Sequence, residues 1–124
     1  MFSTPRNNVV ESDEGFYVEV LGRTGLKYVE GSRAVFIDSE VLMGPHGMAI
    51  DKKSIKNWQI PSGDIDSPEK DKLIRDVHEV TLVGDSFLFE GFTLEEAIDD
   101  NTRDEIIENV RKAFLFQGFE IEID

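Results

Sequence analysis

Apolar and polar residues alternate through much of residues 16–45, as the two faces of a half-buried antiparallel sheet require. Three strand-like runs, at residues 16–21, 26–30 and 33–43, are separated by turns that contain glycine. The pattern predicts a β-meander, and we expect the remaining elements to pack on this meander.

The side chains of the first run should divide between two faces, because successive residues of a strand point to opposite sides. One face is expected to carry Phe16, Val18 and Val20, and the other Tyr17, Glu19 and Leu21. The third run contains three consecutive apolar residues, Val35, Phe36 and Ile37. Such a run is typical of a strand that is buried on both faces. We therefore expect the third run to be a central strand.

Shorter segments around the meander predict smaller elements. Residues 7–12 are a candidate first strand, and residues 48–51 a further short strand after a Gly-Pro-His-Gly turn at residues 44–47. Residues 52–58 are typical of a brief helical turn. Trp58, at the end of this turn, is the only tryptophan and is expected to anchor the segment to the sheet.

A first helix is predicted to begin at Ser67, which can cap it, with Pro68 in the first helical position. The following apolar residues recur at helical spacing and should form one buried stripe. The stripe consists of Leu73, Ile74, Val77 and Val80.

The next segment predicts a strand or hairpin and a short helix. Residues 81–89 are mostly apolar around a turn at Gly84, which favours a strand or a hairpin. Thr93 and Glu96 have the spacing of a capping box, so residues 94–98 are expected to be a short helical piece.

The main helix is predicted over residues 102–116, because Thr102 and Glu105 also have capping-box spacing. Its expected buried stripe is Ile106, Ile107, Val110, Ala113 and Phe114. Gly118 is placed to end this helix, and the alternation in residues 119–123 predicts a terminal strand. The predicted fold class is α+β: an antiparallel sheet, made of the N-terminal β-meander and a C-terminal strand, packed by two main helices within one domain spanning residues 1–124.

Composition narrows the class of protein. A chain of 124 residues is long enough for one hydrophobic core. It contains no cysteine, which excludes a disulfide framework and a thiolate metal site. No apolar run approaches the length of a membrane span, and the first residues lack the apolar part of a signal peptide. We expect a cytoplasmic protein that does not bind membranes.

The charge is strongly negative and unevenly distributed. The chain has 26 acidic residues against 13 Lys and Arg, a formal net charge of −13. Residues 61–124 hold 18 of the acidic residues and 6 of the basic ones, and residues 85–108 hold nine acidic residues and one base, Arg103. Such a field repels nucleic acid and attracts a basic partner. The alternative interpretation is that the charge only keeps the protein in solution.

Recognisable catalytic chemistry is absent from the sequence. Its two histidines, His46 and His78, are too few for a catalytic triad together with a metal site. The sequence Asp99-Asp100-Asn101 lacks the central glycine of a calcium loop. No phosphate-binding or nucleophile motif occurs. We expect no cofactor and no metal. Arg23, at a predicted hairpin tip, is either exposed or an anion contact.

One basic cluster, formed by Lys52, Lys53 and Lys56, lies close to Trp58 and could suggest stacking on nucleic acid bases. The net charge argues against that interpretation. We therefore expect no nucleic-acid partner.

Four pieces of the sequence together resemble a family of small bacterial immunity proteins, which are encoded beside polymorphic toxins, including those of contact-dependent growth inhibition systems. The pieces are EVLGRTGLKYVEG, VFIDSEVLMGP, SIKNW and IIENVRKAFLFQGFEIEID. The resemblance covers roughly residues 15–60 and 98–124 and leaves residues 62–97 as additional material. It implies a protein without enzymatic activity that binds a cognate toxin domain in the cytoplasm and blocks it.

The acidic half of the chain is the predicted toxin-binding region, because many delivered toxins are basic nucleases. The candidate residues are Asp85, Glu90, Glu95, Glu96, Asp99, Asp100, Asp104 and Glu108. Tight binding also needs an apolar centre inside such an acidic rim. Phe87, Phe89 and Phe92 are candidates for that centre, and the alternative is that they belong to the core.

Two other functions stay open at this point. The first is a small enzyme that uses a buried carboxylate of the central strand, such as Asp38 or Glu40, inside a pocket. The second is a structural or adaptor module whose sheet edge pairs with another copy of the chain.

Overall fold

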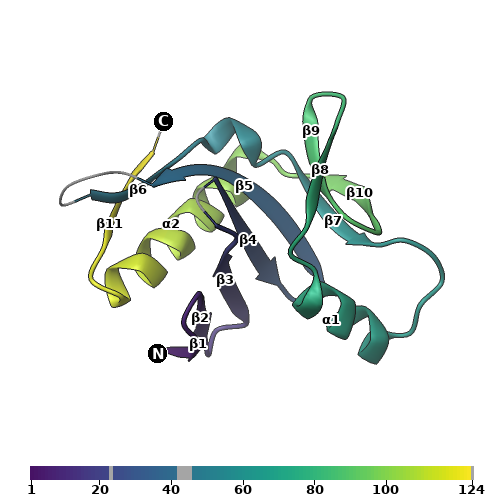
Figure 1. Ribbon diagram of the computed structural model, residues 1–124, viewed down its shortest axis with the longest axis horizontal. Coiled ribbons are helices and arrows are strands. Elements are labelled where there is room, and N and C mark those ends of the chain that lie inside the picture. Colours follow the sequence, from purple (N-terminus) through teal and green to yellow (C-terminus); the bar gives the residue numbers. More distant parts are fainter. Residues whose placement is uncertain (23, 42–45, 124) are drawn as a thin grey trace.

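The computed structural model describes residues 1–22, 24–41 and 46–123. These residues form eleven strands, two α-helices and one 3₁₀ turn (Figure 1). The elements are β1 (Phe2–Arg6), β2 (Val9–Ser12), β3 (Phe16–Val20), β4 (Gly25–Glu30), β5 (Arg33–Val41), β6 (His46–Ile50), η1 (Lys52–Ser54), β7 (Asn57–Pro61), α1 (Ser67–Asp76), β8 (Val80–Val83), β9 (Ser86–Phe89), β10 (Phe92–Ala97), α2 (Asp100–Phe116) and β11 (Glu120–Ile123). The predicted α+β class is confirmed. Arg23 and the Gly44-Pro45 part of the predicted turn lie outside the described residues.

The predicted meander is confirmed as β3, β4 and β5, which pair antiparallel in sequence order. The side chains of β3 divide as the alternation requires. Phe16 and Val18 belong to the core cluster on one face of the sheet. Tyr17 and Leu21 pack against the cluster on the other face. The predicted first strand is confirmed as β2, and β1, which pairs with it, was not predicted.

The long strand β5 joins two branches of the sheet. Near its start it pairs with β7 through Ala34 and Gln59, and β7 in turn pairs with β10. Near its end it pairs with β6 through residues that include Ser39 and Ile50. The predicted terminal strand is confirmed as β11, which pairs with β6. The prediction that this strand joins an antiparallel sheet is wrong, because its pairing with β6 is parallel: α2 carries the chain back across the sheet before β11 begins.

Helix α2 covers one face of the sheet and buries the stripe predicted for it, from Ile106 to Phe114. The helix begins at Asp100, earlier than predicted, because Asp99 is its N-cap: an Asp99 side-chain oxygen accepts the Thr102 backbone N–H at 2.7 Å. The predicted capping box at Thr102 is therefore wrong. The backbone of Gly118 has a φ of 86° just beyond the end of the helix, as predicted.

Helix α1 and the β8–β9 hairpin lie on the opposite face. The N-cap of α1 is Asp66 rather than Ser67, since an Asp66 side-chain oxygen accepts the Glu69 backbone N–H at 3.0 Å. The predicted apolar stripe is only partly helical, because α1 ends at Asp76. Within α1 only Ile74 is buried, whereas Val77 and Val80 pack from beyond the end of the helix.

Three other local predictions are wrong. Residues 94–98 do not form a helix; most of them belong to strand β10, whose pairing with β7 overrides the capping signal at Thr93. The helical turn expected over residues 52–58 is limited to η1, and the buried Trp58 lies on β7. His46, expected in a turn, is the first residue of β6.

Candidate protein-binding surface

The β8–β9 hairpin projects beyond the sheet on the face opposite α2 (Figure 1). Large apolar side chains are exposed near its tip and on the neighbouring strand β10: Leu82 and Val83 are each 57% exposed, Phe87 is 37% exposed and Leu94 is 47% exposed. Asp85 lies in the turn between the two strands. We call these five residues the hairpin surface. An exposed apolar group with a charged neighbour is typical of protein-binding surfaces.

The side chain of Gln59 fixes the base of the hairpin. It is 3% exposed and lies on β7. Its amide nitrogen donates to the Phe87 carbonyl at 2.9 Å, and its amide oxygen accepts the Phe89 backbone N–H at 2.9 Å. One amide side chain thus makes the two hydrogen bonds that a neighbouring strand would make. The hairpin is held to β7 although the two are not in one backbone ladder.

Helix α1 is held to the sheet by Lys27, a fully buried residue of β4. Its ammonium group donates to the carbonyls of Ile74 at 2.8 Å and Val77 at 2.7 Å, at the C-terminal end of the helix. It also lies 3.3 Å from the buried carboxylate of Glu19. Burial lowers the pKa of Lys27 below its usual range, and the charge of Glu19 opposes that effect.

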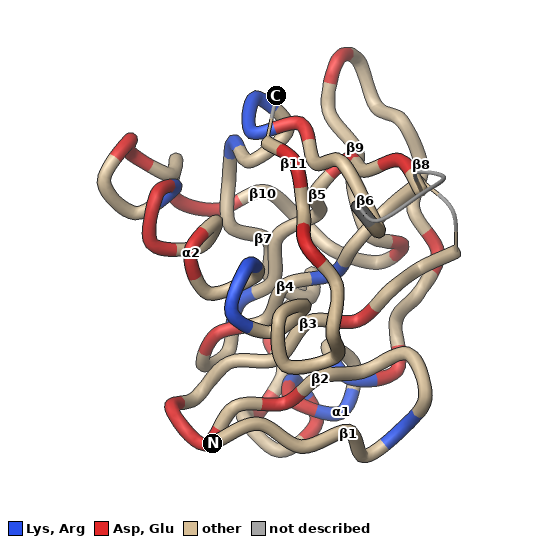
Figure 2. Tube along the Cα trace, turned by 90° about the vertical axis from the view of Figure 1, so that its left-hand side faces the viewer, with Lys and Arg blue, Asp and Glu red and all other residues tan. Residues whose placement is uncertain are grey.

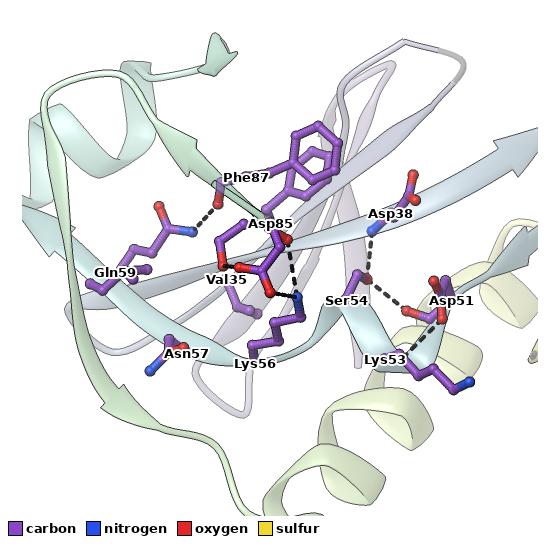
Figure 3. Close-up of a pocket in the computed structure, with 13 residues that line it drawn as sticks. Val35, Asp38, Asp51, Lys53, Ser54, Lys56, Asn57, Gln59, Asp85 and Phe87 are labelled. Atoms are coloured by element: carbon purple, nitrogen blue, oxygen red, sulfur yellow. Dashed lines mark hydrogen bonds and ion pairs between the residues drawn. The ribbon is translucent and has the colours of Figure 1, made fainter. Parts of the chain in front are cut away.

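A pocket of about 170 Å³ lies beside the hairpin surface, between β5, η1 and β7 (Figure 3). The Lys56 ammonium on its wall lies 3.8 Å from the Asp85 carboxylate and donates to the Asp85 carbonyl at 3.0 Å. On the other wall, the Ser54 hydroxyl donates to the Asp51 carbonyl at 2.6 Å and accepts the Asp38 backbone N–H at 2.8 Å. These contacts brace η1 and the hairpin tip.

The carboxylates proposed for an enzymatic function are not buried. Asp38 lines the pocket and is half-buried, while Glu40 is exposed and does not line it. Neither is thus the fully buried carboxylate that the enzyme hypothesis invokes, since Asp38 is only half-buried beside the pocket and Glu40 lies outside it.

The predicted toxin-binding acids at the two ends of β9 lie in different surroundings. Asp85, at the tip, is close to Lys56. Glu90 lies at the other end of β9, and its pKa is raised above the usual value, because its protonated form makes a side-chain hydrogen bond with Glu79 and the negative charge of Glu79 disfavours its ionised form. These two acidic residues do not share one patch.

Four further predicted acids lie on β10 and at the start of α2. Glu96 is 3.5 Å from Arg33, and Asp100 is 2.6 Å from Arg103. Asp99 serves as the helix cap, and the backbone hydrogen bond from Thr102 lowers its pKa. The fourth is Glu95, which is exposed.

Asp104 and Glu108 complete the predicted set on the exposed side of α2, where Glu108 lies 3.6 Å from Arg111. Of the eight acids, Glu95 and Asp104 have no side-chain hydrogen bond or ion pair with any residue that the structure describes. Figure 2 shows acidic residues spread over α2, the hairpin and β11 rather than gathered on one face. Only Asp85 of the eight belongs to the hairpin surface.

Of the three phenylalanines considered as an apolar centre, Phe89 and Phe92 are buried in the core. Phe87 is partly exposed, with its ring centroid 4.8 Å from that of Phe36. Leu82, Val83 and Leu94 were not singled out from the sequence. The first two are adjacent apolar residues directly before the Gly-Asp turn of a hairpin that, among the described residues, pairs only with itself, so the sheet covers neither of them.

Neither helix in the described part of the chain is long and apolar enough to cross a membrane. The described residues contain no group of three or more His, Asp or Glu side chains arranged to hold a metal ion. No protein-family model matches the chain, and neither curated proteins nor solved structures give a match. The resemblance to immunity proteins therefore remains a hypothesis drawn from the sequence.

Proposed function

We propose that this protein is an immunity protein that binds a basic toxin domain in the cytoplasm, most simply a nuclease, and neutralises it through the hairpin surface. One observation carries the proposal: exposed apolar side chains meet at a hairpin within a strongly acidic segment. Residues 76–102 contain eight acidic residues and no Lys or Arg. The resemblance to immunity proteins supplies the kind of partner.

The two parts of the surface have different physical roles in such a complex. Leu82 and Phe87, which face each other across the hairpin, provide the apolar centre that excludes water and slows dissociation, and Val83 adds an apolar contact on the other side of β8. The surrounding carboxylates attract a basic surface and raise the association rate. A nuclease must be basic where it holds nucleic acid, so a partner of this charge would cover the site that its substrate needs.

The hairpin also has little ordering entropy to lose on binding. Gln59 holds its base, Lys56 contacts its tip, and Phe87 packs on Phe36. Rigid anchors bind more tightly than flexible ones, because less conformational freedom is lost. This favours a high-affinity inhibitor over a transient contact.

The charge component is tested with the toxin domain encoded beside the gene. Glu95→Lys reverses an exposed acid that follows Leu94 of the hairpin surface on β10 and makes no side-chain hydrogen bond or ion pair among the described residues, so the fold should be unaffected. We expect slower association, with a weaker dependence on salt, in stopped-flow or biosensor kinetics. Glu14→Lys makes the same change in net charge elsewhere on the exposed surface and serves as the control.

The apolar component is tested by Val83→Asp, which should raise the dissociation rate by about tenfold or more, since it removes an apolar contact and adds a buried charge to the interface. Val41→Asp alters another half-exposed valine, outside the hairpin surface, and should leave the rate unchanged. Failure of the wild-type protein to bind the toxin domain or to protect cells that express it would refute the proposed function. Equal effects of Val83→Asp and Val41→Asp on the dissociation rate would refute the placement of the surface.

A further inference from the structure

The outer edge of β8 offers backbone hydrogen-bonding groups that the described part of the chain does not use. We propose that this edge pairs with an extended, basic segment of the partner, which would convert the two-stranded hairpin into a three-stranded sheet. This inference rests on the proposed function and adds a mode of recognition to it.

The register of the hairpin identifies the free groups. Val83 faces Ser86 across the two-residue turn, and Leu82 faces Phe87. Facing pairs alternate between those that exchange hydrogen bonds and those whose backbone groups point outward. The Glu90 N–H donates to the Glu79 carbonyl at 3.0 Å, so Glu79 and Glu90 form a hydrogen-bonded pair. By alternation, the pairs Thr81–Leu88 and Val83–Ser86 are also hydrogen-bonded. The N–H and C=O groups of Val80 and Leu82 therefore point away from β9.

The other edge of the hairpin bears out this assignment. By the same alternation, the outward groups of β9 belong to Phe87 and Phe89, and these are the groups that Gln59 satisfies. The structure supplies no equivalent for β8, whose only strand partner among the described residues is β9. One edge is thus covered by a side chain, and the other is left open to an incoming strand.

The chemistry around β8 indicates the nature of the incoming segment. Leu82 and Val83 are exposed on opposite sides of the strand and can contact alternate apolar side chains. Glu79 precedes β8, Asp85 follows it, and Glu90 lies opposite Glu79. Carboxylates at both ends of the edge would pair with Lys or Arg residues that flank an apolar core in the segment.

A second copy of the chain fits this edge less well. If two β8 strands paired antiparallel about Leu82, Glu79 of one copy would face Asp85 of the other at both ends of the pair. Like charges directly opposite each other destabilise strand pairs. The acids that would attract a basic segment thus oppose self-association.

Hydrogen exchange of the wild-type protein, free and bound to the toxin domain encoded beside the gene, tests the pairing directly. We expect the amides of Val80 and Leu82 to exchange at least about tenfold more slowly in the complex, since their N–H groups gain acceptors there. The amides of Thr81 and Val83 already point into the hairpin and should change less. This measurement requires no variant.

Leu82→Pro provides a second test, because it removes an outward N–H without breaking a bond inside the hairpin. Leu82→Ala loses the side chain but keeps the N–H and is the matched control. We expect the proline variant to bind the toxin domain about tenfold more weakly than the alanine variant.

Three outcomes would overturn the proposal. If the toxin domain binds but the two amides stay unprotected and the two variants bind alike, the edge is unused while the proposed function stands. If the wild-type protein does not bind the toxin domain, both proposals fail. If light scattering shows a dimer that Leu82→Pro dissociates, the edge pairs with a second copy instead.

Discussion

The two faces of the sheet are stabilised in different ways. The face covered by α2 contains a cluster of seventeen buried apolar residues, among them five from the helix itself. The face covered by α1 and the hairpin contains a cluster of six, beside which lie the buried polar residues Glu19, Lys27 and Gln59. The first layer is held by apolar burial and the second largely by directed hydrogen bonds.

The difference matters for the proposed function, because the hairpin surface belongs to the second layer. A small apolar cluster contributes less to stability than a large one, since the free energy scales with buried apolar area. Hydrogen bonds such as those of Gln59 fix the orientation of the hairpin, and their net contribution to stability is modest. We expect the hairpin layer to be accurately positioned and to open before the α2 layer does.

The largest expected effect is on the α2 side of this comparison. Ile106 is almost completely buried, so Ile106→Ala should lower the free energy of unfolding by about 2–5 kcal/mol. Urea denaturation followed by tryptophan fluorescence would measure it through the buried Trp58. Asp104→Ala, an exposed change on the same helix, should stay within about 0.5 kcal/mol. A loss below 1 kcal/mol for Ile106→Ala would contradict the central role of this cluster.

On the other face, Lys27→Met should have a smaller and more local effect. The change leaves the carbonyls of Ile74 and Val77 unpaired and removes the ammonium beside Glu19. We expect a loss of about 1–3 kcal/mol, because buried polar groups then lack partners. Hydrogen exchange should accelerate in α1 more than in α2. Lys72→Met, an exposed change on α1, is the control, and equal acceleration in both helices would show that the layers are not separate.

The same contrast explains how much of the fold could be predicted from the sequence. The meander and the α2 stripe were predicted because alternation and helical spacing record which residues face a large apolar core, as they do for Val35 and Val110. On the other face, Leu73 has helical spacing yet is exposed, and Phe89 is buried within a segment that could have been a strand or a hairpin. A layer held by Lys27 and Gln59 leaves no periodic signal, since polar residues are read as exposed.

The candidate surface was predicted only in part for a related reason. The acidic character of residues 85–108 is a property of composition and could be read directly. Which of these acids form ion pairs depends on long-range contacts, such as that between Glu96 and Arg33. The exposure of Leu94 follows from the pairing of β10 with β7, and the capping-box spacing of Thr93 and Glu96 pointed to a helix there instead. Neither a distant ion pair nor strand pairing is encoded in local spacing.

The smallest expected effect concerns Tyr17, whose hydroxyl is buried on the α1 face without a hydrogen-bond partner among the described residues. Burial, and secondarily the charge of Glu19, raises the pKa of Tyr17 to about 12 from a usual value of 10.0. Since the folded-state pKa is the higher one, the contribution of this group to stability is complete below pH 10 and is lost as the pH rises from 10 towards 12.

Tyr17→Phe removes both the unpaired hydroxyl and this titration. We expect a gain of up to about 1 kcal/mol in the free energy of unfolding at pH 8, and a shallower loss than in the wild-type protein between pH 10 and 12, measured by urea denaturation across that range. Tyr28→Phe is the matched contrast on the α2 face. The Tyr28 hydroxyl donates a hydrogen bond to the Glu30 carboxylate at 2.8 Å and accepts one from the Asn109 side-chain amide at 2.9 Å. That variant should be destabilised, because both partners lose a hydrogen bond. If the two phenylalanine variants behave alike, the hydrogen bonding of each hydroxyl does not decide whether its removal stabilises or destabilises the protein.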